Sequence, residues 1–187
     1  MPHIIPIYIL ALYKIKKYKQ VLKFGNKALE KDIAVNLKQL ISRTVAYTLY
    51  ITIQQKEEAH NLIKQSGDMA GPGKIAIKMW NGATVSYNEI YELILSSKNE
   101  VSAIIGNLLI HFQYTTIINL FEDESTKLRA MNIDFLYYAA ILLLNDNEEL
   151  IKKIPPELLG AARSFQGVIR RMQQKYYPEL NLPDFEA

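Results

Sequence analysis

Apolar residues recur at three- and four-residue spacing along most of the chain, which is the pattern of amphipathic helices. In the N-terminal part this pattern predicts one helix after Pro6 and a longer one from about Lys27 to Lys64. Gly25-Asn26 is the predicted break between them, because glycine and asparagine commonly end one helix and begin the next. The stretch Thr44–Ile53 is rich in β-branched residues and fits either a helix or a strand.

The C-terminal part also predicts helices. Ser86 with Glu89, and Ser97 with Glu100, match the capping box, in which a serine oxygen accepts a backbone N–H bond at a helix start. The apolar pattern that follows Ser97 predicts helices over residues 98–121, 126–144 and 157–177.

Between these two parts the chain loses its helical pattern. Residues 66–73 hold three glycines and one proline and predict a loop. Residues 74–86 place two short apolar runs on either side of Asn81-Gly82, a dipeptide typical of two-residue hairpin turns. The expected fold is therefore all-α, mainly a helical bundle, with an extended helical basic N-terminal arm and one small β-hairpin near residues 74–86. The predicted organisation is a basic helical arm (1–65), a loop and β-hairpin (66–83), a helical bundle (84–177) and a C-terminal tail (178–187).

Charge is distributed unevenly over the chain. The net charge is +3 overall, but +7 over residues 1–64, −6 over residues 65–150 and +2 over residues 151–187. Such asymmetry is typical of proteins that bind polyanions. The candidate nucleic-acid-binding residues are Lys14, Lys16, Lys17, Lys19, Lys23, Lys27, Lys31, Lys38 and Arg43. If they neutralised about seven phosphates, the affinity would fall with salt at a log–log slope of roughly −6.

The residues that most catalytic and metal sites need are scarce. There is no cysteine, and the histidines His3, His60 and His111 lie far apart in the sequence. Gly71-Pro72-Gly73-Lys74 lacks both the earlier glycine and the following Ser or Thr of a phosphate-binding loop. We therefore expect no enzyme, no cofactor and no metal ion. The sequence also predicts neither a cleavable signal peptide nor a membrane-spanning segment.

A basic helical arm at 1–64 joined to a helical bundle at 84–177 resembles, in architecture, the major coat (capsid) proteins of filamentous archaeal double-stranded DNA viruses. The resemblance implies a structural protein that packages duplex DNA without sequence preference. The basic series from Lys14 to Arg43 would be its phosphate-contacting face. It also implies oligomerisation through the bundle, with itself or a paralogue, and a location in a virion or in the cytoplasm.

Two other functions fit the same residues. Ile90, Ile94, Val101 and Ile104 have the spacing of a helix-turn-helix motif, which a preceding hairpin would make a winged variant, and this would indicate a DNA-binding regulator. Tyr91 and Leu95 depart from that motif, and the segment lies in the acidic third of the chain. The other function is a helical adaptor whose basic end binds an acidic protein or, less favoured, an anionic membrane.

Overall fold

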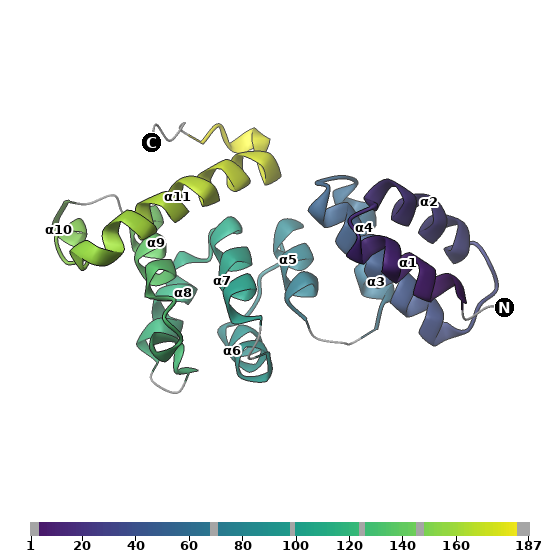
Figure 1. The fold of residues 1–187 in the computed structure, drawn as a ribbon, viewed down its shortest axis with the longest axis horizontal. Coiled ribbons are helices and arrows are strands. Elements are labelled where there is room, and N and C mark those ends of the chain that lie inside the picture. The colour runs from purple at the N-terminus through teal and green to yellow at the C-terminus, as the bar shows by residue number, and fades with distance from the viewer. Residues whose placement is uncertain (1–3, 68–70, 98–99, 124–125, 145–147, 183–187) are drawn as a thin grey trace. The chain divides into compact units, whose positions relative to one another are not determined.

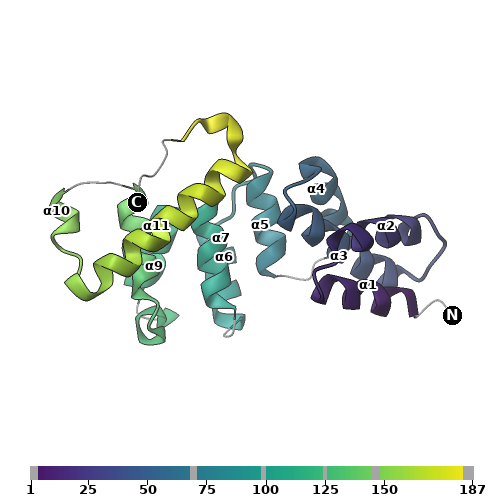
Figure 2. The same cartoon turned by 45° about the horizontal axis from the view of Figure 1, so that its top comes forward.

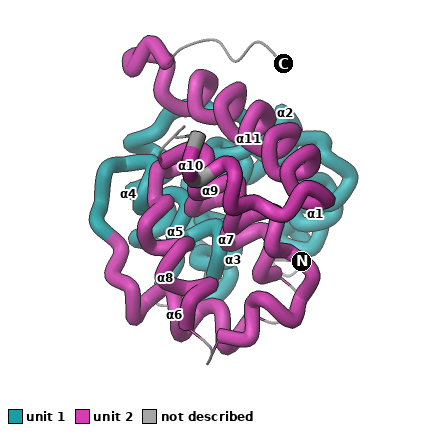
Figure 3. Tube along the Cα trace, turned by 90° about the vertical axis from the view of Figure 1, so that its left-hand side faces the viewer, with its two compact units in different colours: residues 1–84 teal, residues 85–187 magenta. Residues whose placement is uncertain are grey.

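The computed structural model describes residues 4–67, 71–97, 100–123, 126–144 and 148–182. Within these ranges every regular element is a helix, so the predicted all-α class is confirmed (Figure 1). The chain forms two compact units, residues 1–84 and residues 85–187, which are coloured separately in Figure 3. His3 and the last five residues of the predicted tail lie outside the described ranges.

The N-terminal unit is built around one helix, α3. The helices of this unit are α1 (Ile4–Lys14), α2 (Tyr18–Leu29), α3 (Val35–Ile51), α4 (Lys56–Gln65) and α5 (Pro72–Trp80). Helix α3 contacts all four of the others, and α1 and α2 also contact each other (Figures 1 and 2). The N-terminal basic segment is thus packed into a compact unit, and the extended arm predicted for residues 1–65 is not confirmed.

Helix α3 buries polar as well as apolar side chains. Ile41, Val45 and Leu49 are at most 1% exposed and recur every four residues along its length. Thr44 and Thr48 are also buried, and each hydroxyl donates to the carbonyl four residues earlier at 2.8 Å. This local bond satisfies a hydroxyl that would otherwise lose its partner on leaving water. The β-branched stretch from Thr44 is therefore compatible with a helix. Of the two structures that the sequence allowed for Thr44–Ile53, helix and strand, the chain forms a helix as far as Ile51.

The break predicted at Gly25-Asn26 is wrong, because α2 continues through both residues to Leu29. Gly25 instead lies where α2 packs closely against α3. A Cβ atom at Gly25 would lie 2.4 Å from Cγ2 of Val45, a distance that real Cβ atoms essentially never show. The glycine thus serves close helix packing and not a turn.

The predicted helix from Lys27 to Lys64 is also wrong, because the chain leaves the helical conformation twice within it, at residues 30–34 and 52–55. At the second break Ile53 has a φ of +53°. The Ile53 amide donates to the Tyr50 carbonyl, and the Gln54 amide donates to the Leu49 carbonyl. This pair of bonds is a Schellman motif, which ends a helix at a left-handed residue and is usually announced by a glycine.

The β-hairpin predicted near residues 74–86 is wrong as well. Residues 72–80 form α5, and Asn81-Gly82 ends it with the same motif. Gly82 has a φ of +78°, its amide donates to the Met79 carbonyl, and the Ala83 amide donates to the Lys78 carbonyl. A glycine at positive φ suits a hairpin turn and a helix C-terminus equally well. The dipeptide therefore located a chain reversal but not its type.

The C-terminal unit contains the remaining helices. They are α6 (Tyr87–Ser96), α7 (Val101–Ile110), α8 (Tyr114–Glu122), η2 (Leu128–Met131), α9 (Asp134–Leu144), α10 (Glu148–Ile151), α11 (Pro156–Tyr176) and η3 (Pro178–Leu180). The Ser86 cap is confirmed, since its hydroxyl accepts the Glu89 amide at 3.2 Å. The second predicted cap is wrong, because α7 begins after Glu100.

Two of the helices predicted in this unit are interrupted. Within the predicted helix 98–121, α7 ends at Ile110 and α8 begins at Tyr114. Phe112 between them has a φ of +61°. The Phe112 amide donates to the Leu109 carbonyl and the Gln113 amide to the Leu108 carbonyl, which is a further Schellman motif. The segment 126–144 begins with the short helix η2, and α9 starts only at Asp134. The last predicted helix, 157–177, agrees with α11.

Helix α11 crosses α7 and α9 and holds their C-terminal ends through polar side chains (Figure 2). Gln166 and Arg170 donate to the carbonyls of Leu142 and Leu143 near the end of α9. Gln173, which is fully buried, donates to the Leu109 carbonyl at 2.7 Å and to the Tyr114 hydroxyl at 2.6 Å. The last carbonyls of a helix lack the usual partner four residues later, and these side chains donate to three of them. The Leu109 carbonyl accepts from the Phe112 amide as well as from Gln173.

The close packing at Gly25 gives a stability prediction. Gly25→Ala should destabilise the protein, because overpacking against Val45 costs about 1–3 kcal/mol and exceeds the gain of roughly 1 kcal/mol from the better helix former. Gly160→Ala is the matched control, since a Cβ there meets nothing within 4 Å. Thermal unfolding followed by circular dichroism should show a lower midpoint for Gly25→Ala and an equal or higher one for Gly160→Ala. A rise for both variants would contradict the close approach.

The polar face of α11 gives a second prediction. Gln173→Met keeps the side-chain volume but removes the donor to the Tyr114 hydroxyl and the shorter of the two hydrogen bonds to the Leu109 carbonyl. We expect a loss of about 1–3 kcal/mol in the free energy of unfolding, measured in urea. Arg171→Met on the exposed side of the same helix should change it by less than about 0.5 kcal/mol. Equal stability of the two variants would show that Gln173 is not a structural cap.

Candidate nucleic-acid interface

The sign of the charge changes where one unit ends and the next begins. Residues 1–84 hold 13 Lys or Arg and 5 Asp or Glu, for a net charge of +8. Residues 85–187 hold 9 and 14, for a net charge of −5. The basic character is therefore a property of a folded unit. Helix α5 adds Lys74 and Lys78 to it, whereas the two lysines and two glutamates of α4 cancel.

The predicted binding residues are distributed over the first three helices and the turns between them. Lys14 ends α1, Lys16 and Lys17 lie in the following turn, Lys19, Lys23 and Lys27 lie on α2, Lys31 follows it, and Lys38 and Arg43 lie on α3. All eight lysines are exposed. Arg43 is half-buried and is engaged in interactions of its own, so it contributes least to the accessible surface.

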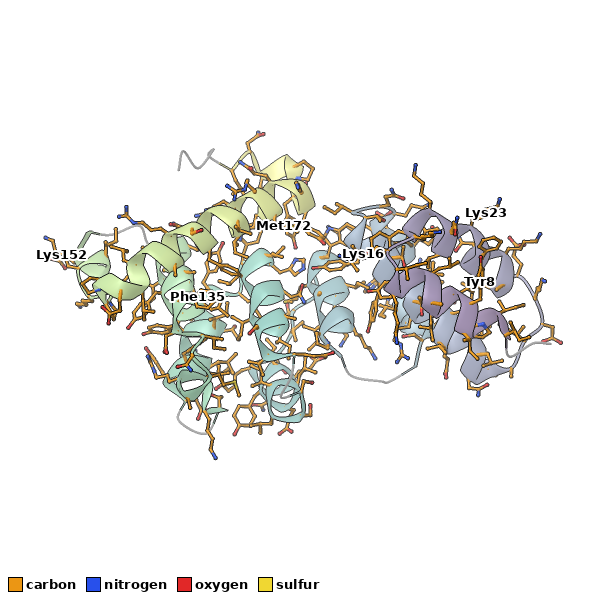
Figure 4. All side chains as sticks on the ribbon, viewed as in Figure 1. Tyr8, Lys16, Lys23, Phe135, Lys152 and Met172 are labelled. Atoms are coloured by element: carbon orange, nitrogen blue, oxygen red, sulfur yellow. The ribbon has the colours of Figure 1, made fainter. Side chains whose placement is uncertain are left out.

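Three of these lysines form a line along α2. Lys19, Lys23 and Lys27 are spaced four residues apart, which places them on one face of the helix, while the opposite face is buried. At a rise of 1.5 Å per residue the line is about 12 Å long. One strand of duplex DNA carries a phosphate about every 3.4 Å along the helix axis, so the line spans several phosphates. Figure 4 labels Lys23 within it.

Three lysines also surround a hollow of about 520 Å³ at the turn between α1 and α2. Lys16, Lys17 and Lys19 line it together with Tyr18, Gln20, Leu22, Thr52 and Gln54. Ammonium groups and amide side chains are the donors that contact phosphate and sugar oxygens in nucleic-acid complexes. Figure 4 labels Lys16 in this region. The sequence did not predict the contributions of Thr52 and Gln54, which come from the end of α3.

Lys16 is held in a strained backbone conformation. Its φ is +58°, which is costly for a residue with a Cβ atom. The Lys16 amide donates to the Tyr13 carbonyl and the Lys17 amide to the Leu12 carbonyl, so α1 ends in a Schellman motif without a glycine. This tight turn brings Lys16, Lys17 and Lys19 close together beside the end of α1.

Aromatic rings lie next to the lysines. Tyr8 and Phe24 meet edge to face at 5.6 Å between ring centroids, and the Lys23 ammonium lies 5.9 Å from the Phe24 ring. The rings of Tyr13 in α1 and Tyr18 in α2 lie 6.0 Å apart between centroids. Burial raises the pKa of Tyr13, with smaller contributions from the hydroxyls of Tyr18 and Tyr47, so its phenol stays neutral beside the lysines.

The lysine arrangement does not serve stability. In the part of the chain that the structure describes, none of the eight lysines forms an ion pair with a carboxylate. Like charges four residues apart on a helix are destabilising by roughly 0.2–0.5 kcal/mol per pair. A surface selected only for stability would place acidic residues among them. Among the described residues, ion pairs therefore do not offset the repulsion between these lysines.

Other chemistry is sparse in the described ranges. No group of three or more His, Asp and Glu side chains among these residues could hold a metal ion. Burial lowers the pKa of His60, and the nearby positive charges of Lys64 and Lys78 lower it further. His111 is buried and bonds through Nδ1 with the Tyr177 hydroxyl. His60 and His111 thus lie in different units.

Comparisons with known protein families, with characterised proteins and with solved structures find no match for this chain. None of the described helices combines the length and the apolar character needed to cross a bilayer.

The strain at Lys16 gives a prediction that separates conformation from charge. Lys16→Gly should raise the free energy of unfolding by about 1 kcal/mol relative to Lys16→Ala, because only glycine adopts the positive φ without cost. Both variants remove the same charge, so their affinities for DNA should fall equally. Urea unfolding measures the first quantity and titration with duplex DNA the second. A Lys16→Gly variant no more stable than Lys16→Ala would contradict the left-handed turn.

Proposed function

We propose that this chain is a non-enzymatic, structural DNA-binding protein that contacts the duplex through the N-terminal unit. The observation that carries the proposal is the basic surface formed by the end of α1, the turn that follows it and the outer face of α2. It holds six exposed lysines that lack ion pairs among the described residues: Lys14, Lys16, Lys17, Lys19, Lys23 and Lys27. Several cations held on a folded unit release counterions from DNA together, which is the main source of non-specific affinity.

The composition of this surface supports binding without sequence preference. Eight of the nine predicted residues are lysines, and the lysine ammonium is a point charge that suits a phosphate. Base recognition relies on arginine, asparagine or glutamine side chains that bond two base atoms at once. Among the exposed residues that the structure describes on α2, Gln20 alone is an arginine, asparagine or glutamine. Phosphate contacts therefore predominate.

The finer proposal is a coat protein that packages DNA in a virion, with assembly in the cytoplasm of the host. The two units carry net charges of +8 and −5, so the basic unit of one copy attracts both DNA and the acidic unit of a neighbouring copy. Such a chain would oligomerise along DNA, with itself or with a paralogue. The support here is the charge division between the two units.

A helix-turn-helix regulator has less support. Helices α6 and α7 are consecutive and joined by a short connection, as that motif requires. The described exposed residues of α7, however, are Ser102 and Ala103, and five of its ten residues are buried. Lys98 and Asn99, two of the polar residues that would reach bases, lie outside the described residues. The unit that contains α7 is also the acidic one.

The proposal predicts how binding to DNA depends on salt. A variant with Lys16, Lys17, Lys19, Lys23 and Lys27 changed to Gln should bind random-sequence duplex more weakly, with a log–log salt slope shallower by about 4–5. Fluorescence anisotropy over a series of salt concentrations measures both quantities. Far-ultraviolet circular dichroism should be unchanged, because all five side chains are exposed.

The matched control removes five exposed cations from the other unit. Lys152, Lys153, Arg163, Arg171 and Lys175 are exposed, and changing them to Gln alters the net charge equally. This control should keep most of the wild-type affinity and slope. Equal losses of DNA affinity in both variants would show that binding depends on net charge alone and would contradict the proposed surface. Absence of DNA binding by the wild-type protein would favour the adaptor function instead.

A further inference from the structure

Helix α1 is apolar on the side that faces solvent. Its inward positions Ile9 and Leu12 are buried, as in any packed helix. Its outward positions are also apolar, and large: Ile4 is 61% exposed, Ile7 67% and Tyr8 48%, and Ile15 just after the helix is 61% exposed. We call these four residues the isoleucine face. A helix that is apolar all round is normally covered on every side.

A groove continues this face towards α2. It has a volume of about 280 Å³ and is lined by Ile4, Ile5, Tyr8, Phe24, Ala28 and the lysines Lys27 and Lys31. The edge-to-face contact between Tyr8 and Phe24 links the two helices at this point. An apolar surface is thus bordered on the α2 side by Lys23, Lys27 and Lys31, and at the end of α1 by Lys14. Figure 4 labels Tyr8 and Lys23 on this part of the molecule.

The bordering charges decide what can cover the isoleucine face. Two copies that paired through this face would bring both sets of lysines together, and like charges held in apposition across an interface oppose binding. A complementary surface must be apolar at its centre and negatively charged around it. A bilayer that contains anionic lipids has both properties, with acyl chains beneath a layer of phosphates.

We propose that the isoleucine face of α1 docks on an anionic lipid bilayer. Ile4, Ile7 and Ile15 enter the boundary between headgroups and acyl chains, and the ring of Tyr8 lies at headgroup level. The bordering lysines bond lipid phosphates. Helix α1 is about 16 Å long at 1.5 Å per residue, too short to span a hydrocarbon core of about 30 Å, so it lies in the plane of the interface.

The test is flotation of the full-length protein with vesicles. Wild-type protein should float with vesicles of phosphatidylcholine and phosphatidylglycerol and stay behind with phosphatidylcholine alone. The double variant Ile7→Ser/Tyr8→Ser should lower the partition coefficient at least about tenfold, since each exposed side chain contributes apolar area to insertion. Its affinity for duplex DNA should be unchanged, which separates this surface from the proposed function.

The matched control is Leu95→Ser/Val168→Ser, which removes two exposed apolar side chains from the other unit. It should float like the wild type. The proposal is overturned if Ile7→Ser/Tyr8→Ser also floats like the wild type, or if flotation does not depend on phosphatidylglycerol. It is equally overturned if the wild type is a dimer in solution that Ile7→Ser/Tyr8→Ser dissociates, because a second copy would then cover the face.

A second measurement reports insertion directly. Tyr8→Trp places an indole in the isoleucine face, while the native Trp80 is 3% exposed. The added emission should shift to shorter wavelength with anionic vesicles and not with duplex DNA. No shift with anionic vesicles would contradict docking through α1.

Discussion

Helix α3 is covered by α1, α2, α4 and α5, and this enclosure determines where the lysines of the N-terminal unit can lie. Burial of Ile41, Val45 and Leu49 requires α2 to approach closely, which Gly25 permits. Once the apolar face of α2 is fixed against α3, Lys19, Lys23 and Lys27 must point outward. Hydrophobic packing thus holds these like charges close together, although they would separate in a flexible segment. The burial of apolar side chains in the core offsets the repulsion between them.

That surface has two parts with different chemistry. The turn between α1 and α2 and the outer face of α2 are basic and polar, which suits phosphate oxygens. The outer face of α1 is apolar, and the lysines of α2 lie at its border. DNA and lipid phosphates would therefore use some of the same cations. The two surfaces therefore adjoin along α2.

The sequence predicted the helical class and the basic residues because both depend on local spacing and composition. It failed at three helix ends that carry no glycine. Lys16, Ile53 and Phe112 all adopt positive φ and close Schellman motifs, and no local pattern marks them. The sequence marked Gly82 as a turn residue, but a glycine at positive φ suits both a hairpin turn and the C-terminus of a helix. The hollow beside Lys16 could not be predicted, since Thr52 and Gln54 reach it only through the packing of α3 against α2.

The DNA-binding surface is tested most directly by a lysine footprint of the full-length protein. Acetylation is measured at each lysine by mass spectrometry, with and without random-sequence duplex DNA. We expect strong protection of Lys16, Lys17, Lys19, Lys23 and Lys27. We expect unchanged reactivity of Lys152, Lys153 and Lys175, which are also exposed but lie in the acidic unit. Protection spread evenly over both units, or confined to the second, would contradict a DNA-binding surface on α1 and α2.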